Sequence, residues 1–334
     1  MTPWTRRALA APAAAVRRGG SRAAPASRRA PPEGGPRVGA GLRIGYACVN
    51  TQLPSPARTV RLANATPERL RQVITANLDA LEAIVRWNEE HEVQVFRLTS
   101  NLIPFASHAA NTLAWWDEFG DRLRTLGGLL RRTAARISTH PAQYTVLSSA
   151  QPAVVSAAVA ELEYHDRLLT ALGLDRSHKI VLHLGSGGSD SKAAYGRFSA
   201  GFERLSEGVR QRLALENDER WALDEVLVLA EALGLPVVFD VFHHQLAPSL
   251  HGLGARELVR HAGASWRAHD GRQEVHFSTQ EPGKRPGAHA ETVDVDALGA
   301  FVAEVVDLPL DCILEVKDKE QSVLRARGFL CAAR

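Results

Sequence analysis

Short apolar segments typical of β-strands alternate with helical segments eight times along the chain, and this alternation constrains the fold more than any other feature. The strand-like segments cover residues 43–50, 93–101, 135–140, 179–185, 212–218, 236–244, 274–281 and 311–318. Helical spacing is expected between them, starting with Thr66 as a cap before Pro67, over about 111–133 as one helix, and over 152–172 with Gly173 as its stop. Eight parallel strands with right-handed crossovers predict an α/β fold, the TIM (β/α)8 barrel.

An open, doubly wound sheet is the competing arrangement. It would collect its polar residues at one crevice, on two or three strand ends. Here polar residues follow nearly every strand-like segment: His140, His183, Glu216, Asp240, His243, His276 and Glu315, with His108 in the loop after the second segment. A closed barrel brings all these ends to one ring, so the distribution favours the barrel.

The mixture of carboxylates and imidazoles at these strand ends indicates a metal centre. A single histidine at a strand end is more often structural, but eight such residues at the same end predict shared cations. Three acids and five imidazoles are too many for one ion, so we expect two or three divalent cations, manganese or zinc by ligand type. Such clusters activate water and hold attacking and leaving oxygens in line, which predicts phosphoryl-ester hydrolysis. We expect four residues to carry the catalysis: Glu216, Asp240, His276 and Glu315.

The remaining polar features are weaker signals. Six histidines in helical or loop contexts are interpreted as solvated or structural: His91, His165, His178, His251, His261 and His269. The segment GSGGSDSK at 185–192 lacks the ending of a phosphate-binding loop and is interpreted as an ordinary turn. Gln143 and Tyr144 follow a candidate ligand directly and either probe a base stack or pack under a loop. Lys317 and Lys319 either meet phosphates or are solvated.

Residues 1–40 differ in composition from the rest of the chain. They hold eight arginines and one acidic residue, Glu33, which leaves 32 basic and 36 acidic residues in 41–334, so the body is mildly acidic despite the formal charge of +3. We interpret 1–40 as a disordered basic tail, leaving open a transit peptide or an over-extended start, and 41–334 as the barrel domain. No apolar run approaches the roughly 20 residues of a membrane span, and a cytoplasmic location is expected.

Three cysteines, Cys48, Cys312 and Cys331, show no CxxC spacing. Their pattern predicts neither a disulfide framework nor a thiolate zinc site, and it fits a reducing compartment.

The chain resembles the UV damage endonuclease family, the UvdE-type enzymes related to endonuclease IV and the xylose isomerase-like barrels. The resemblance rests on GYACVN, RLTSNLIPFASH, STHPAQYTVLSS, LHLGSGGSDSK, LALENDER, VVFDVFHHQ, EVHFSTQEPGKRPGAHAETVD and ILEVKDKE, in that order, over about residues 43–325. It implies a barrel with up to three metal ions, commonly manganese, that nicks DNA immediately 5′ of UV photoproducts and leaves a 3′-hydroxyl. The ligands implied by the motifs are His108, His140, His183, Glu216, Asp240, His243, His276, His289 and Glu315.

The resemblance also implies DNA contacts, and the chain departs from the family's pattern at one position. Gln143 and Tyr144 match the family's lesion-probing pair, and Tyr46 and Asn50 match its DNA-facing first strand. The seventh strand of the family usually carries a lysine, thought to be carboxylated, at the place of Glu274. We therefore expect Glu274 to replace that modified lysine as a ligand or near-ligand.

The expected function is a metal-dependent DNA repair endonuclease acting on UV-damaged double-stranded DNA, with no obligate protein partner. Lys317 is counted among its DNA-binding residues. Manganese is favoured over zinc or magnesium. Three alternatives stay open: an abasic-site endonuclease, a metal-dependent sugar isomerase of similar barrel type, and a damage-binding protein without turnover.

Overall fold

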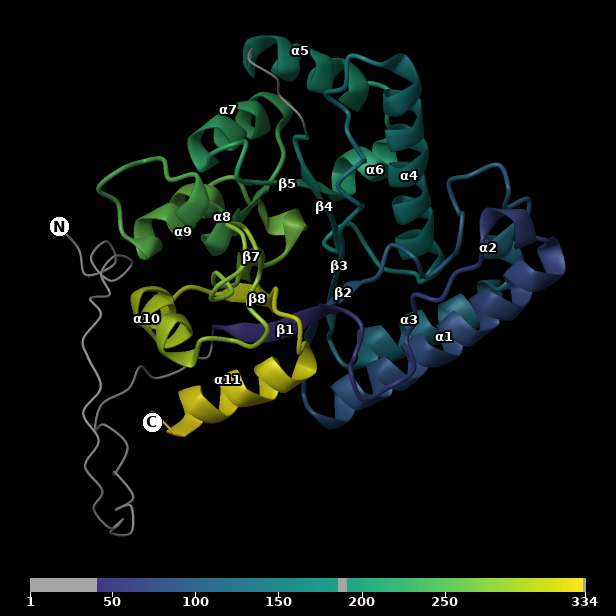
Figure 1. The fold of residues 1–334 in the computed structure, drawn as a ribbon, viewed down its shortest axis with the longest axis horizontal. Coiled ribbons are helices and arrows are strands. Elements are labelled where there is room, and N and C mark those ends of the chain that lie inside the picture. The colour runs from purple at the N-terminus through teal and green to yellow at the C-terminus, as the bar shows by residue number, and fades with distance from the viewer. Residues whose placement is uncertain (1–40, 186–190, 333–334) are drawn as a thin grey trace, which may run out of the picture.

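The chain forms a closed barrel of eight parallel strands in sequential order, as the alternation predicts (Figure 1). The computed structural model describes residues 41–185 and 191–332. The strands are β1 (Arg43–Cys48), β2 (Val95–Leu98), β3 (Arg136–Thr139), β4 (Lys179–His183), β5 (Leu213–Glu216), β6 (Val237–Asp240), β7 (Gln273–Phe277) and β8 (Leu310–Leu314). β8 pairs with β1 through Arg43↔Asp311 to Tyr46↔Leu314, which closes the sheet.

Helices surround the barrel (Figure 1). They are α1 (Pro67–Glu90), α2 (Trp115–Glu118), α3 (Gly120–Arg132), α4 (Pro152–Ala171), α5 (Ser191–Phe202), α6 (Glu207–Arg212), α7 (Leu223–Leu233), α8 (Val241–Leu246), α9 (Ala255–Gly263), α10 (Val295–Val305) and α11 (Glu320–Ala332), with 3-10 turns η2 (Leu62–Asn64) and η3 (Ala268–Asp270). Local signals explain several boundaries. The Thr66 hydroxyl accepts from the amide of Arg69 at 3.3 Å to cap α1, and Gly234 ends α7 in a left-handed conformation with φ 69°.

Three sequence expectations need correction. The single helix expected over 111–133 is two, α2 and α3, because the chain leaves helical geometry at Phe119 (φ −102°, ψ 13°), just before Gly120. Two helices, α5 and α6, lie between β4 and β5, where the alternation implies a single helical segment. The run 236–244 is not one strand, since α8 begins directly after Asp240. The Asp240 side chain caps α8 by accepting from the amide of His243 at 2.6 Å.

The core has an apolar outer layer and a largely polar interior. Large buried side chains such as Phe239 and Phe277 pack between strands and helices. Because side chains alternate along a strand, the intervening positions point into the barrel. Small apolar groups fill part of this interior, for example Val181, Ala214 and Val238. The layer above them, at the carboxyl ends of the strands, is occupied by ionisable side chains, and this layer forms the candidate site.

Within the described ranges, no helix combines the length and apolar character that crossing a membrane requires.

Candidate metal centre and active site

Acidic and imidazole side chains from successive strands meet at the carboxyl-terminal end of the barrel. Within the described part of the chain, two groups place their ligand atoms within 4.8 Å of one another. The first consists of His140, His183 and Glu216, and the second of Glu216, Asp240, His276 and Glu315. Glu216 belongs to both groups, so one carboxylate joins two candidate cation positions. This arrangement is typical of two-metal sites.

Glu216 makes short contacts with members of both groups. Its Oε2 lies 2.8 Å from His140 Nε2 and its Oε1 lies 2.6 Å from His276 Nδ1. His183 Nε2 is 3.7 Å from the same Oε2. The two carboxylate oxygens therefore face different groups.

Burial and neighbouring charges shift the pKa values of the site. Burial, reinforced by Glu315 and Glu216, raises the pKa of Asp240 to about 7, and burial lowers the pKa of His183 to about 4. Burial opposes protonation of His276, but the charge of Glu216 and the hydrogen bonds to Glu216 and Glu274 together raise the His276 pKa to about 10. Although burial also opposes the charge of Glu216, the imidazoles of His276, His183 and His140 hold its pKa well below the ordinary value. A neutral His183 and an ionised Glu216 are the forms that bind cations.

The donor atoms fit divalent cations. Asp240 Oδ1 accepts from the His243 amide, whereas Oδ2 is buried and has no hydrogen-bond partner among the described residues. A buried carboxylate oxygen without a donor is costly unless a cation or water meets it. Mixed imidazole nitrogens and carboxylate oxygens suit manganese or zinc. The donor set of this cluster therefore fits divalent cations.

The outer nitrogens of two histidines are tied to backbone carbonyls. His140 Nδ1 lies 3.0 Å from the Pro141 oxygen, and His289 Nδ1 lies 3.0 Å from the Glu315 oxygen. Their Nε2 atoms then point toward acids, since His289 Nε2 is 3.7 Å from Glu315 Oε2. Such anchoring of the second nitrogen is usual for histidines that bind metal.

His243 and His289 border the second group. Their ring centroids are 5.9 Å apart, and His243 lies 5.7 Å from His183. His243 reaches this position from α8, with its Nδ1 3.2 Å from Glu219 Oε2.

Besides His243 and His289, two further expected ligands lie outside both groups. His108 is exposed, and its Nδ1 accepts from the amide of Ala110 at 3.0 Å. Glu274 is fully buried inside the barrel, and its Oε1 lies 3.1 Å from His276 Nε2. Both remain predictions as ligands.

The residues expected to contact DNA divide into exposed and buried ones. Tyr144 is 72% exposed, and Gln143 is exposed beside it on the loop after β3. Lys317 is exposed and pairs with Glu291 at 3.1 Å. Tyr46 and Asn50 are only 0% and 2% exposed, because the Tyr46 hydroxyl donates to Asn88 Oδ1 at 2.8 Å and Asn50 donates to that hydroxyl at 3.2 Å. Direct DNA contact by these two stays a prediction, and in the folded chain their hydrogen bonds tie the end of β1 to Asn88 of α1.

One side chain of the site was missed from the sequence. Arg97 of β2 places Nη2 2.5 Å from Glu315 Oε1 and 2.8 Å from His276 Nε2. With His276 and against burial, it holds the pKa of Glu315 below the ordinary value. The available signal was an arginine inside an otherwise apolar strand, which requires a buried acidic partner.

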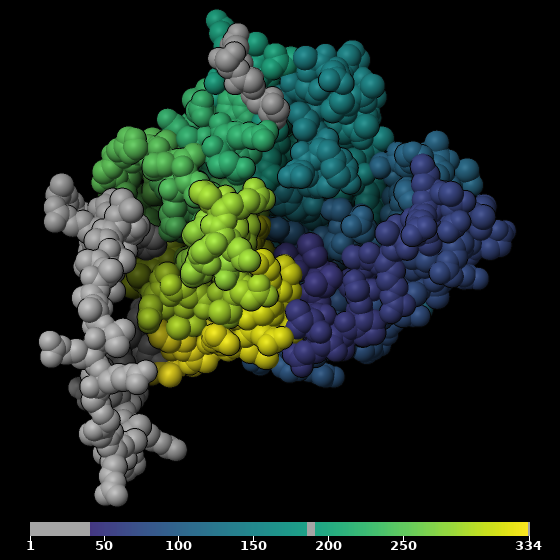
Figure 2. Space-filling view, in the orientation of Figure 1, coloured from purple at the N-terminus to yellow at the C-terminus, as the bar shows by residue number. Residues whose placement is uncertain are grey.

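The surface is hollowed near the centre of the face shown in Figure 2, beside the protruding yellow-green segment between β7 and α10. This segment includes His289, so a loop with a candidate ligand borders the hollow.

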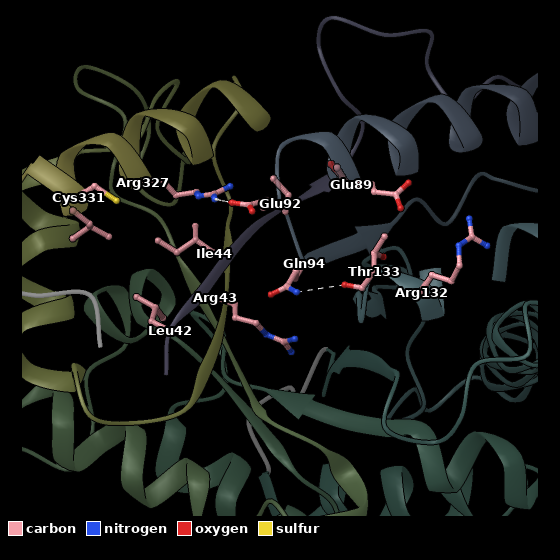
Figure 3. Close-up of a pocket in the computed structure, with 13 residues that line it drawn as sticks. Leu42, Arg43, Ile44, Glu89, Glu92, Gln94, Arg132, Thr133, Arg327 and Cys331 are labelled. Atoms are coloured by element: carbon pink, nitrogen blue, oxygen red, sulfur yellow. Dashed lines mark hydrogen bonds and ion pairs between the residues drawn. The ribbon is translucent and has the colours of Figure 1, made fainter. Parts of the chain in front are cut away.

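A cavity of about 550 Å³ lies at the opposite end of the barrel, where β1 begins (Figure 3). Two of its arginines have acidic partners within the protein: Arg327 Nη2 lies 3.4 Å from Glu92 Oε2, and Arg43 donates to Asp311. Gln94 donates to the Thr133 oxygen at 3.4 Å. The residues that line it include no histidine, so the cavity lacks the donor set of the metal centre.

Comparison with known proteins agrees with the fold and shows the family. The model of the family UV-endonuclease UvdE matches residues 42–331. A UV DNA damage endonuclease from Clostridium perfringens is 34% identical over 294 residues, which cover 86% of this chain and 71% of that protein. The crystal structure of SacUVDE shares 35% identity with a TM-score of 0.82, covering 87% of this chain and 98% of that one.

Endonuclease IV from Thermus thermophilus shares the fold, with a TM-score of 0.54 and 16% identity over 86% of this chain and 98% of that one. The match of the family model over nearly the whole described chain, together with the relatives above 30% identity, is decisive. The chain belongs to the UV-endonuclease UvdE family.

Proposed function

We propose that this chain is a divalent-metal-dependent endonuclease that nicks the DNA backbone immediately 5′ of UV photoproducts and leaves a 3′-hydroxyl. Family membership supports the activity on UV-damaged DNA. The observation that carries the metal dependence is the sharing of Glu216 between two groups of candidate ligands. A carboxylate shared by two ligand groups would help to hold a pair of divalent cations, and such pairs catalyse displacement at phosphorus.

The proposed ligands fall into two sets around Glu216. His140 and His183 complete the first group, whereas Asp240, His276 and Glu315 complete the second, with His243 and His289 at its border. His108 joins them only if its loop turns inward from the exposed position it has here. Bound divalent cations supply an activated water and neutralise charge on the scissile phosphate.

The residues of the chain set the geometry around these ions. Glu216 Oε1 and Oε2 face the two groups separately, and Arg97 fixes one oxygen of Glu315. The fixed donors cost little reorganisation during the reaction. We assign the catalytic role to four residues: Glu216, Asp240, His276 and Glu315.

Gln143 and Tyr144 supply the proposed lesion probe. An aromatic side chain with 72% of its surface exposed has no core to stabilise, and it follows the candidate ligand His140 by four residues. Damaged base pairs are cheaper to unstack than intact ones, so a wedge selects them by deformability. Lys317 is proposed to meet a backbone phosphate.

A plasmid assay tests the proposal. Purified protein with manganese is incubated with supercoiled plasmid that is UV-irradiated, abasic or undamaged, and parallel reactions contain EDTA. We expect relaxed circles from irradiated plasmid in the manganese reaction, with none from EDTA or undamaged DNA, and 3′-hydroxyl ends that a polymerase extends. Cleavage of abasic plasmid with irradiated plasmid left intact would instead assign an abasic-site endonuclease. If the protein binds irradiated plasmid but leaves it intact, the chain would be a damage-binding protein without turnover.

The cytoplasmic location stays a prediction, as do the tail and barrel boundaries. Residues 1–40 and 186–190 lie outside the described residues, so the expected basic tail and most of GSGGSDSK are not part of this description.

A further inference from the structure

Glu274 sits one layer deeper in the barrel than the candidate ligands. It precedes His276 by two positions on β7, so both side chains point inward, and Glu274 pairs in register with Asp311 rather than with the end of β8. Its side chain is fully buried. The carboxylate therefore lies beneath the ring of strand-end ligands, on the side away from solvent.

The carboxylate of Glu274 contacts His276 from the interior of the barrel. Its Oε1 lies 3.1 Å from His276 Nε2 and accepts from the Ser138 hydroxyl at 2.9 Å. Although burial opposes the charge, His276, Arg136 and Arg97 lower the pKa of Glu274, so it is a carboxylate acceptor. An ionised acceptor binds an imidazole N–H more strongly than a carbonyl does.

The orientation of His276 is the reverse of its neighbours'. His140 and His289 direct Nδ1 to backbone carbonyls and Nε2 toward the acids. His276 directs Nδ1 toward the acids, 2.6 Å from Glu216 Oε1 and 3.9 Å from Asp240 Oδ2. Its Nε2 lies 3.1 Å from Glu274 Oε1 and 2.8 Å from Arg97 Nη2, so Glu274 is the acceptor and Arg97 the competing donor at this nitrogen.

We propose that Glu274 is a positioning residue that accepts the Nε2–H of His276 and thereby makes His276 bind its divalent cation through Nδ1. Glu274 is then not a metal ligand itself. The inference rests on the proposed metal centre. It adds which ring nitrogen of His276 binds the cation and which side chain determines that choice. Anchors of this kind fix the tautomer and raise the basicity of the ligating nitrogen.

The test uses the full chain loaded with Zn²⁺, a diamagnetic probe ion, without DNA. Nitrogen-15 NMR of labelled histidines reports the state of each ring nitrogen, and a crystal structure of the Zn²⁺-loaded protein reports bond distances. We expect His276 Nδ1 bound to the ion, Nε2 protonated, and both oxygens of Glu274 outside the ion's coordination shell. A Glu274 oxygen about 2.0–2.2 Å from the ion, or binding through His276 Nε2, would overturn the proposal.

Variants add a second readout by isothermal titration with Zn²⁺. Glu274→Met removes the acceptor at similar size, and we expect about 10–100-fold weaker binding and a mixed His276 tautomer. Glu274→Gln keeps an acceptor oxygen and should recover most of the affinity and the parental tautomer. Ser138→Ala, which removes the other hydrogen bond of Oε1, is the matched control and should bind as the parent does. Parental affinity and tautomer in Glu274→Met would overturn the proposal.

Failure of this inference and failure of the proposed function are distinguishable. A parent protein that binds Zn²⁺ through His276 Nδ1 but leaves irradiated plasmid intact supports the role of Glu274 and removes the nuclease. A parent that nicks irradiated plasmid while a Glu274 oxygen binds the ion supports the nuclease and rejects the positioning role of Glu274. If Glu274→Met does not fold, the NMR and crystal measurements on the parent and on Glu274→Gln still decide, and a parent that binds no ion rejects the inference.

Discussion

Glu216 offers one carboxylate oxygen to each of the two groups of candidate ligands. Its contacts with His140 and His276 are both shorter than 3 Å, and it is almost completely buried. Loss of Glu216 should therefore disturb both candidate cation positions, whereas loss of a neighbour that belongs to one group should disturb only that position.

Glu216→Gln should release both cations, because an amide is a poor replacement for a bridging carboxylate. We expect metal content measured by plasma emission spectroscopy to fall at both positions. The nicking rate should drop by more than about 100-fold, which is the upper range for loss of a supporting partner. Glu89→Gln, exposed beside the cavity at the other end of the barrel, is the control and should keep the parental metal content and nicking rate. Parental metal content in Glu216→Gln would contradict the bridging role.

Tyr144→Ala should weaken damage recognition without changing stability. The ring is exposed, so its removal costs no core packing, whereas base stacking on an aromatic side chain is worth about 1–3 kcal/mol. We expect unchanged thermal unfolding and about 5–150-fold weaker binding of UV-irradiated duplex by fluorescence anisotropy. Tyr144→Phe keeps the stacking surface and should bind as the parent does. Equal binding by the alanine variant would exclude the wedge.

At the scale of elements, the junction between β3 and the loop before β4 depends on a neutral histidine. His178 Nδ1 accepts from the amide of Ile137 at 3.0 Å. Burial, with the nearby Arg136, lowers the pKa of His178 to about 4, whereas an unfolded chain has a histidine pKa near 6.5. The unfolded state thus takes up the proton first as the pH falls.

Stability from His178 should therefore be complete above about pH 6.5 and be lost as the pH falls toward 4. The difference in pKa corresponds to roughly 2–3 kcal/mol over this window. Urea unfolding at pH 7 and pH 4.5 measures it. His178→Gln, which has an amide oxygen to accept the same amide proton, should lose less stability on acidification than the parent does. His251→Gln, at an exposed position, should follow the parent, and a parental slope for His178→Gln would refute the assignment.

The elements show how far the sequence predicts such a molecule. Alternation of apolar runs with helical spacing predicts the closed barrel, and the capping of α1 by Thr66 and the stop at Gly234 follow local chemistry. α8 was missed because PVVFDVFHH is apolar and β-branched almost throughout, and its turn into a helix depends on the Asp240 cap. Arg97 and the reversed ring of His276 depend on partners 218 and 60 residues away, which no local pattern contains.

At the scale of the whole molecule, closure of the barrel concentrates negative charge in a buried ring. Glu216, Asp240 and Glu315 lie in one group, opposed mainly by Arg97 and His276. Only the folded chain assembles this ring, so cations that bind it stabilise the folded state.

Removal of metal should therefore lower the melting temperature. At a free Mn²⁺ concentration of 100 times Kd the stabilisation is about 2.7 kcal/mol, equivalent to several degrees for a domain of this size. Differential scanning calorimetry of the chelated and the Mn²⁺-loaded protein measures the change. Addition of Mn²⁺ should raise the melting temperature of Glu216→Gln less than that of Glu89→Gln. Identical melting curves with and without Mn²⁺ would argue against a metal centre.

The position of Glu216 between the two groups also predicts how the ions load. The fold already holds both oxygens in place, so either position can be filled first. Turnover needs both positions filled, so molecules with one ion are inactive. Activity should rise more steeply than hyperbolically as manganese is added, which makes this repair step a threshold response to the supply of the ion.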